Sequence, residues 1–245
     1  DMIGVAKSNS VVDYGMLEYC IREDLNKRAQ RVMVVFNPVR LIITNYPDDK
    51  IEMMDAVNNP EDESMGKRKI PFSKVLYVER DDFMEEPDPK FFRLAPGKEV
   101  RLQHGYYVTC TGYKKNEKGE VEEIYCTYDP DSRGGWTNDG RKVKGTIHWV
   151  SAKESIDVEV RLYDHLFTKE NPDDVEEGKS FTDYINPNSL VVITAKAEPF
   201  LAECDEEYYQ FLRNGYFRKD EDSTKEKLVY NKTVGLKDSW NKGKK

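Results

Sequence analysis

Cysteine and histidine are scarce in this chain of 245 residues, which has four cysteines and three histidines. The cysteines form no C-x-x-C pair and have no histidine at a metal-ligand spacing; they are Cys20, Cys110, Cys126 and Cys204. Cys20 falls on an apolar helical pattern and two others fall in strand-like runs. We therefore expect no metal site, and we interpret the cysteines as buried free thiols in a reducing compartment.

The sequence motifs of catalysis are also absent. The sequence has no H-E-x-x-H spacing, no G-x-S-x-G elbow, no G-x-x-x-x-G-K-[ST] phosphate loop and no G-x-G-x-x-G turn. The histidines are His104, His148 and His165, and His148 is interpreted as structural because it precedes Trp149 in an apolar run. We therefore expect no catalytic residue in this chain.

Long apolar runs are missing. No stretch approaches the roughly 18 to 20 apolar residues that a transmembrane helix needs, and the first seven residues lack the basic-then-apolar layout of a secretory signal. These absences predict a cytoplasmic protein without a membrane anchor. Because the chain starts with Asp1 rather than Met, we interpret it as a piece of a longer protein.

Charged and aromatic residues are abundant. Charged residues make up 34% of the chain, and there are 15 Tyr and 10 Phe, which long disordered chains lack. The net charge of −8 argues against indiscriminate binding of nucleic acid. Acidic residues crowd 48–63 and 173–177, both expected to be loops, whereas basic residues gather in 90–101 and 141–144. This distribution is compatible with a basic face for one folded RNA, and a mixed solvated surface is the simpler alternative.

The first predicted element is a helix over residues 10–29. Ser10 and Asp13 have the S-x-x-D form of a capping box, and Lys27 and Arg28 place positive charge at the negative end of the helix dipole. An apolar face at helical spacing is predicted from Leu17, Cys20, Ile21 and Leu25.

Short apolar runs typical of strands fill the rest of the chain. Runs at 31–36 and 39–43 flank Asn37-Pro38 and indicate a hairpin. Further runs, with turns at 116–119 and 138–140, occupy 74–79, 99–113, 122–128, 142–150, 157–163, 190–196, 207–217 and 228–236. Many short strands joined by turns predict antiparallel sheets, closed into barrels or packed as sandwiches. The Gly- and Asp-rich stretch 129–140 is the predicted boundary between two β units.

Several segments, in collinear order, resemble one family. The longest is DGRKVKGTIHWVSA at 139–152. The others are CIREDLN at 20–26, NPVRL at 37–41, GKEVRL at 97–102, CTYD at 126–129, INPNSL at 185–190 and TVGLKDSW at 233–240. Together they span nearly the whole chain and resemble the C-terminal part of the class I glutaminyl-tRNA synthetases.

This resemblance implies a mainly β fold, with two antiparallel β-barrels in tandem after a short α-helical segment. The implied division is 1–28 for the end of a helical connection, 29–135 and 136–230 for two anticodon-binding barrels, and 231–245 for a C-terminal segment. The family's HIGH-like and KMSKS-like motifs are absent, so no cofactor is expected here. ATP with Mg would bind a catalytic domain that precedes this region.

The resemblance also implies an anticodon site. In the family, the residues matching Arg31 and Gln210 converge on the middle anticodon base. Those matching Arg93 and Arg101 read the flanking bases. Further matched positions are Arg213 beside Gln210, Lys90 where some members have Gln, and Gln103 where some have a second Arg. A segment near the anticodon stem matches Lys7, Ser8, Asn9 and Ser10.

The residues alone leave structural alternatives open at these positions. Arg93 and Arg101 could be surface arginines in cross-strand ion pairs with Glu99 or a neighbour. Arg31 could lie at a helix exit near backbone carbonyls, and Gln210 could be a solvent-facing strand residue. Four aromatic residues could stack on bases, but core packing is the favoured role for them: Tyr106, Tyr107, Trp149 and Phe217.

Function follows from the resemblance. The chain is predicted to be the tRNA-binding part of a glutamine–tRNA ligase, inactive alone and monomeric, with the glutamine tRNA and its own catalytic domain as partners. Arg forks and the mixed donor and acceptor edge of Gln suit unpaired bases. The alternatives are the same part of a glutamyl-tRNA synthetase, a β-barrel that binds ribosomal RNA, and a structural or protein-interaction domain.

Overall fold

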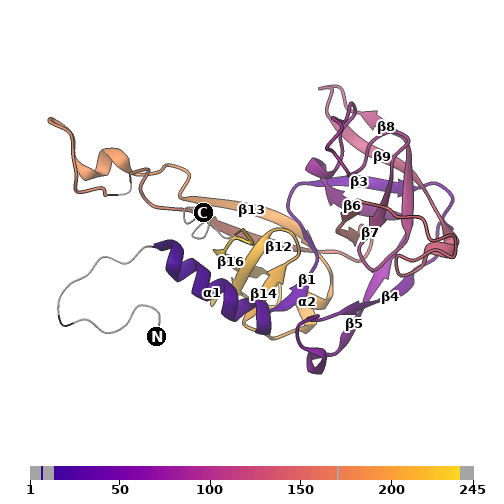
Figure 1. Cartoon of the computed structure of the whole chain (residues 1–245), viewed down its shortest axis with the longest axis horizontal. Helices are drawn as coiled ribbons and strands as arrows, with labels where there is room; N and C mark the ends of the chain where they lie inside the picture. The colour runs from indigo at the N-terminus through magenta and orange to yellow at the C-terminus, as the bar shows by residue number, and fades with distance from the viewer. Residues whose placement is uncertain (1–6, 8–13, 170, 238–245) are drawn as a thin grey trace.

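The structure is a computed structural model and describes residues 7, 14–169 and 171–237. It consists of one helix followed by two nearly closed seven-stranded barrels (Figure 1). The mainly β fold with two barrels after a helical segment, predicted above, is confirmed.

We call the seven-stranded sheet that contains β3 and β11 the first barrel. Its strand order is β10-β7-β8-β9-β3-β6-β11. The strands are β3 (Pro38–Ile43), β6 (Val75–Glu79), β7 (Glu99–Leu102), β8 (Tyr107–Lys115), β9 (Val121–Tyr128), β10 (Thr146–Ile147) and β11 (Trp149–Ser151). Alternate residues point inward, as Leu76 and Val78 of β6 do, and pack around Trp149.

We call the other sheet the second barrel. Its strand order is β1-β14-β15-β16-β12-β13-β2. The strands are β1 (Gln30–Val32), β2 (Val34–Val35), β12 (Ile156–Tyr163), β13 (Leu190–Ala197), β14 (Tyr208–Phe211), β15 (Gly215–Lys219) and β16 (Leu228–Val234). A short helix, α2 (Phe200–Glu203), joins β13 to β14, and the core gathers around Tyr209, Phe211 and Phe217.

The first barrel is inserted into the second. Strands β1 and β2 come before the first barrel in the chain but pair with β14 and β13 of the second, while β10 and β11 pair with β7 and β6 of the first. Two of the crossing strands pair parallel with their neighbours, β1 with β14 and β10 with β7. Two pairs within single barrels are also parallel, β3 with β9 and β12 with β16. Each of the two predicted segments therefore contributes strands to both barrels: 29–135 includes β1 and β2 of the second barrel, and 136–230 includes β10 and β11 of the first. The division at these residues stays a prediction about the sequence.

The predicted hairpin at Asn37-Pro38 is wrong. The two runs belong to different barrels, because β2 pairs with β13 whereas β3 pairs with β6. The backbone N–H groups of Phe36 and Asn37 donate to the Glu79 carboxylate at 2.8 and 3.0 Å instead of forming a hairpin ladder. The segment is the crossover between the barrels.

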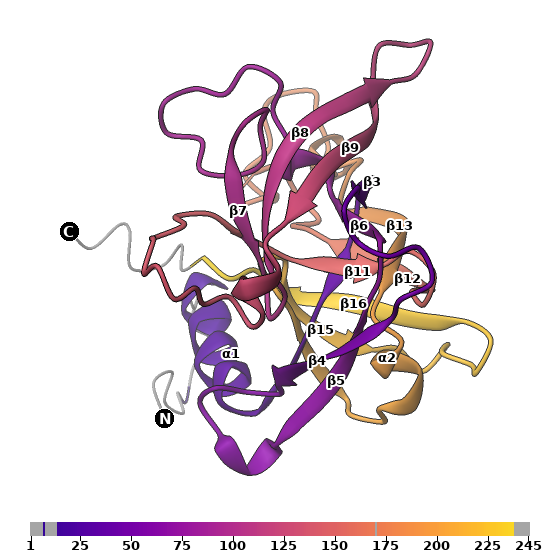
Figure 2. The ribbon, with the colours of Figure 1, turned by 90° about the vertical axis from the view of Figure 1, so that its right-hand side faces the viewer.

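A two-stranded ribbon lies in the acidic region that was expected to be a loop. Strands β4 (Glu52–Val57) and β5 (Lys67–Phe72) pair antiparallel, joined through a 3-10 turn, η1 (Glu63–Met65) (Figure 2). Met54 and Ala56 point into the core while Met53 and Asp55 are exposed. Asp55 lies on the solvent face of the strand, whereas Glu52 is half-buried and accepts hydrogen bonds from the hydroxyls of Tyr46 and Tyr106. The charged residues in and around the strand made its period of two hard to recognise in the sequence.

The helix α1 (Tyr14–Arg28) packs on the outside of the second barrel. Leu25 and Ala29 are buried against Tyr216 and Val234. Lys27 and Arg28 lie in the last turn as predicted, but Leu17 is exposed and does not belong to the buried face. The predicted capping box at Ser10 and Asp13 falls outside the described residues.

Buried ion pairs and hydrogen bonds join the barrels. Arg68 of β5 makes a two-pronged ion pair with Glu198, with Nη2 and Nε at 2.7 and 2.9 Å from the carboxylate oxygens, and Glu198 also accepts the Met33 N–H at 2.8 Å. The ring of His148 lies 3.0 Å from the Val34 carbonyl oxygen. Since a charge left unpaired at this depth costs several kcal/mol, these contacts favour a fixed angle between the barrels.

The interpretation as buried thiols holds for two of the four cysteines, and the core-packing interpretation holds for the four aromatic residues. Cys110 and Cys126 are buried thiols in the first barrel, and Cys20 and Cys204 are half-buried. The four aromatic residues for which core packing was favoured are buried: Tyr106, Tyr107, Trp149 and Phe217.

Candidate nucleic-acid interface

Arg31 and Gln210 are direct neighbours on the outer face of the second barrel. Strands β1 and β14 run parallel with Arg31 opposite Gln210, so their Cα atoms are about 5 Å apart. Val32 and Phe211, next to them in sequence, point into the core. Two positions about 180 residues apart in the sequence are thus placed side by side, as their predicted shared role requires.

Both side chains have polar atoms without a partner. Arg31 Nη2 donates to Asn26 Oδ1 at 3.1 Å, but Arg31 Nε and Gln210 Oε1 are buried and make no hydrogen bond within the described part of the chain. Buried polar groups are nearly always hydrogen-bonded, because an unpaired one costs about 1–3 kcal/mol. A ligand that offers a donor and an acceptor would satisfy both atoms.

Tyr216 completes this second-barrel cluster. It lies opposite Gln210 across β14 and β15, and its hydroxyl donates to Asn26 Oδ1 at 3.2 Å. Burial raises the pKa of the Tyr216 hydroxyl, and the nearby positive charge of Arg31 opposes that shift. The phenol is therefore neutral at physiological pH and holds the Asn26 oxygen that orients the Arg31 fork.

Arg101 forms a second cluster, on the first barrel. Its side chain stands on the outer face of β7, with its guanidinium carbon 5.9 Å from the centre of the Tyr107 ring, and its Nε atom is buried without a partner. Glu99 pairs with Arg141 at 2.9 Å. The ion pair with Glu99 that offered a structural alternative for Arg93 and Arg101 is made by Arg141.

Arg93 lines a cleft beside this cluster. Lys90, between two lining residues in the sequence, is exposed, and Arg93 is anchored by Nη1, which donates to the Asp81 carbonyl at 3.0 Å and lies 3.4 Å from Asp82 Oδ1. The cleft has a volume of about 390 Å³ and brings together the two basic segments noted in the sequence, its charged and aromatic lining being Asp88, Phe91, Phe92, Arg93, Lys98, Glu99, Lys142 and Lys144. Lysines outnumber carboxylates there, which favours a phosphate or a base edge.

Gln103 follows β7 in a tight turn. Its carbonyl accepts the Trp149 indole N–H at 2.9 Å, and its side-chain nitrogen lies 3.4 Å from the ring of His104. Burial, reinforced by the positive charge of Arg68, lowers the pKa of His104 to about 4. Gln103 therefore sits beside a neutral imidazole, with its amide partly exposed.

Arg213 is engaged at the junction between the barrels. Its Nη1 and Nη2 atoms each lie 2.6 Å from an oxygen of Asp82, a residue that is 0% exposed, and Nη1 lies 3.3 Å from His148 Nδ1. This two-pronged contact raises the pKa of the guanidinium. The side chain would have to leave Asp82 unpaired in order to turn its fork to a base.

The β4–β5 ribbon connects the two clusters. The Arg31 N–H donates to the Asn58 carbonyl at 2.8 Å, and Arg133, on the loop against β7, donates from Nη2 to the Met53 carbonyl at 3.1 Å. Five residues of extended chain between Met53 and Asn58 span about 17 Å. The ribbon residues that contact Arg31 and Arg133 are therefore about that far apart.

The predicted stem-contact segment is described only at its first residue. Lys7 is exposed. Ser8, Asn9 and Ser10 lie outside the described residues.

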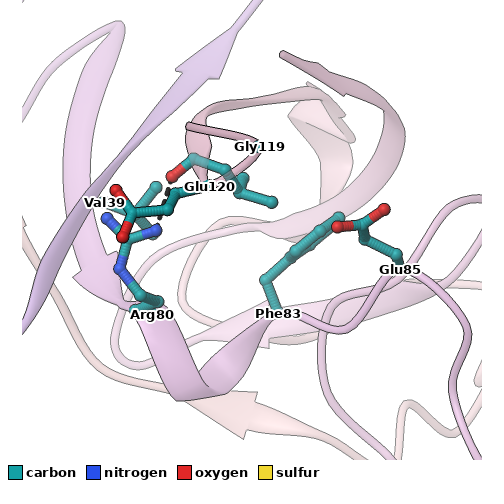
Figure 3. A pocket seen from close by; sticks show the side chains of 7 residues that line it. Val39, Arg80, Phe83, Glu85, Gly119 and Glu120 are labelled. Carbon is teal, nitrogen blue, oxygen red and sulfur yellow. Dashed lines mark hydrogen bonds between the residues drawn. The ribbon is translucent and has the colours of Figure 1, made fainter. Parts of the chain in front are cut away.

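A second, smaller cleft has the wrong charge for an RNA phosphate. Its volume is about 260 Å³, and it lies between Val39, Arg80, Phe83 and the β8–β9 turn (Figure 3). Glu85 and Glu120 line it, and Arg80 Nη1 donates to the Val121 carbonyl at 2.5 Å. In the part of the chain that the structure describes, no group of three or more His, Cys, Asp or Glu residues is arranged to hold a metal ion.

Known proteins match along most of the chain. A family model described as the anticodon-binding domain of class I tRNA synthetases (E and Q) matches residues 29–129, and another with the same description matches 146–220. The chain belongs to this family. The relatives called glutamine–tRNA ligase include those of Nitrobacter hamburgensis (52% identical over 241 residues), Rhodopirellula baltica (52% over 241) and Clostridium perfringens (50% over 242).

These relatives are longer than the chain. The matches cover 98%, 98% and 97% of this chain but 42%, 40% and 43% of the respective relatives. The chain thus spans about two fifths of their length, and it is their anticodon-binding part. No helix among the described residues is both long and apolar enough to span a membrane.

Two parts of this anticodon-binding structure were missed in the sequence. The ribbon that connects the clusters was hidden among acidic residues, although the alternation from Glu52 to Val57 marks it. The stretch 129–140, predicted only as a boundary, also folds against β7, which was not foreseen from the sequence. Its Gly134-Gly135 pair, with φ values of +79° and +85°, was the available sign of a fixed turn.

Proposed function

We propose that this chain reads the anticodon of the glutamine tRNA for a full-length glutamine–tRNA ligase. The proposal rests on the juxtaposition of Arg31 and Gln210, which present an unpaired buried donor and an unpaired buried acceptor on adjacent strands. A uracil edge offers one acceptor and one donor to meet them. Arg31 and Gln210 would bind the middle base of the triplet.

The first-barrel residues would take the flanking bases. Arg101, Gln103, Lys90 and Arg93 all belong to the first barrel or to the segments beside it. The ribbon positions that contact Arg31 and Arg133 are about 17 Å apart, more than the roughly 7 Å between the first and third of three stacked nucleotides. The bases would therefore be splayed apart, which is how proteins usually read single-stranded RNA. Arg213 would act chiefly by fixing the barrels, and Lys7 to Ser10 would lie toward the stem.

Binding measurements with the 245-residue chain test this function. The probes are a transcript of the glutamine tRNA and transcripts with one anticodon base replaced. Arg31→Ala should weaken binding to the cognate transcript by about 1–3 kcal/mol, roughly 5- to 150-fold, and weaken binding to the middle-base variant much less. Equal affinity of the unsubstituted chain for cognate and variant transcripts would refute the proposal.

Matched controls separate base reading from general charge. Arg40, an exposed arginine of β3 paired with Glu123, lies three strands from β7 in the sheet order, and Arg40→Ala should change affinity less than twofold. Gln210→Glu keeps the shape but replaces the amide donor with a charge, so it should abolish the preference for the cognate middle base. All affinities should fall steeply with salt because phosphate contacts release counterions.

The glutamine rather than the glutamate tRNA is the proposed substrate because the relatives reported above carry the name glutamine–tRNA ligase. The full-length protein would carry out ATP-dependent aminoacylation, with ATP and Mg bound outside this chain, as a cytoplasmic monomer. Aminoacylation of both tRNAs by the full-length protein distinguishes the two substrates.

The extension between β12 and β13 would contact the catalytic part. It projects away from both barrels (Figure 1). Exposed large apolar side chains lie on it, namely Leu166, Val175, Phe181 and Ile185, and on the adjoining ends of β12 and β13, namely Tyr163, Leu190, Val191 and Val192. Exposed apolar patches of this kind mark interaction surfaces. The relatives contain further residues outside the matched region that could pack on this patch. Leu166→Asp with Phe181→Asp should slow aminoacylation by the full-length protein while anticodon binding stays unchanged. Unchanged aminoacylation would contradict this contact.

A further inference from the structure

Trp136 is the most exposed of the large apolar side chains in the described ranges, with 77% of its surface accessible. It lies on the connection between β9 and β10, which projects beside β7 (Figure 2). By contrast, Trp149 is fully buried. Tryptophan is enriched at binding interfaces, where its apolar ring is covered while its N–H can still reach a partner.

The backbone that carries Trp136 is fixed. The Tyr107 hydroxyl donates to the Gly135 carbonyl at 3.1 Å, and the Gly135 N–H donates to the Ser132 carbonyl at 2.8 Å. Ser132 Oγ in turn accepts the Tyr107 N–H at 2.8 Å. A Cβ on Gly135 would lie 2.8 Å from Arg101 Cδ, so the loop packs tightly on that arginine. The backbone that leads into Trp136 is therefore held next to Arg101.

The surroundings of the ring are polar and basic. Arg133 is exposed three residues before it, and Arg101 has its unpaired Nε atom beneath the loop. Two nearby carboxylates, Asp129 and Asp139, are already engaged by Arg141, while Asp131 is exposed. A single aromatic ring among cationic donors is too small for a stable protein interface, which buries about 800 Å² on each partner. It has the composition of a stacking site for an unpaired base.

We propose that Trp136 is a stacking platform for an unpaired base of the bound RNA loop, next to the base that Arg101 contacts. This inference rests on the proposed anticodon-binding function. The indole face would cover one face of the base, and Arg133 would lie close enough to meet the adjoining phosphate. Stacking would be tolerant of base identity, because every base has a π face, so Trp136 would add affinity while Arg101 adds discrimination.

Binding of anticodon stem-loop RNA to the 245-residue chain tests the platform. Trp136→Ala should weaken binding about 5- to 150-fold, and Trp136→Phe should weaken it much less because a ring is kept. Both variants should melt at the temperature of the unsubstituted chain, since the side chain is exposed. Trp136→Phe should also remove most of the quenching of tryptophan fluorescence that RNA causes.

Stem-loop RNAs with a single abasic position identify the stacked base. For the unsubstituted chain, one position next to the base contacted by Arg101 should lower affinity, and at that position Trp136→Ala should cause no further loss. Equal affinities of Trp136→Ala and the unsubstituted chain overturn the inference. A Trp136→Ala effect on self-association of the chain, without an effect on RNA binding, also overturns it. If the unsubstituted chain fails to distinguish anticodons, the proposed function fails instead.

Discussion

The ion pair between Arg213 and Asp82 offers the sharpest test of how the barrels are held. Both Asp82 oxygens lie 2.6 Å from the guanidinium nitrogens, and the aspartate has no exposed surface. Arg213→Met keeps the apolar stem but leaves a buried carboxylate without its main partner. We expect this change to destabilise the protein through the junction rather than through lost contact with RNA.

The magnitude follows from burial. Removing one partner of a buried ion pair costs about 3–5 kcal/mol. The Arg213 side chain is 34% exposed, so water can reach the carboxylate, and Arg93 remains 3.4 Å from Asp82 Oδ1. We therefore expect a loss of about 2–3 kcal/mol. For a chain of this size that corresponds to a melting temperature about 5–10 °C lower.

A double variant separates the two roles of Arg213. Asp82→Asn together with Arg213→Met removes the charge that needs compensation, so at least half of the lost stability should return in thermal and urea unfolding. RNA binding should weaken equally for all anticodons in Arg213→Met and recover in the double variant. A normal melting temperature for Arg213→Met, with a loss confined to the cognate anticodon, would refute the reasoning and make Arg213 a base-reading residue.

Three further changes probe the core and the RNA surface. A Cβ on Gly145 would lie 1.7 Å from the Phe92 carbonyl oxygen, so Gly145→Ala should cost about 1–3 kcal/mol in urea unfolding, while Gly112→Ala, which meets no atom within 4 Å, serves as the control. Burial lowers the pKa of His104 from 6.5 to about 4. Between those pH values the unfolded chain binds a proton that the folded protein does not, so stability should decrease as the pH is lowered from 6.5 to 4, by at most about 2 kcal/mol, and less steeply in His104→Asn. Glu198→Gln leaves a buried guanidinium uncompensated and should cost about 3–5 kcal/mol; a loss below 1 kcal/mol would contradict that account.

Base reading and barrel assembly use different side chains at neighbouring positions. Gln210 and Arg213 are three residues apart, yet Gln210 faces the open surface beside Arg31 while Arg213 turns to Asp82 in the junction. The turn between β14 and β15 produces this divergence, with Arg213 at a positive φ of 68°. Substitutions here should therefore be judged by stability and by anticodon preference together.

The sequence by itself determined the fold class and most of the strands. Alternating runs such as Val75–Glu79 and Tyr208–Phe211 record which side chains face the core, and that local period survives folding. The absence of catalytic motifs and the collinear resemblance to glutaminyl-tRNA synthetases came from the sequence as well. The β4–β5 ribbon escaped detection because its polar face carries the charges of a loop.

Only the tertiary structure decided which residues meet. Arg31 and Gln210 lie side by side because β1 leaves its sequence neighbours to pair with β14 of the other barrel, and no local pattern encodes a pairing across nearly 180 residues. The same crossover turned an apparent hairpin at Asn37-Pro38 into a link between barrels. Burial also depends on the assembled chain, so the sequence did not show that Arg213 pairs with Asp82 in the junction. For the same reason it did not show that the stretch 129–140 packs on Arg101 and carries Trp136.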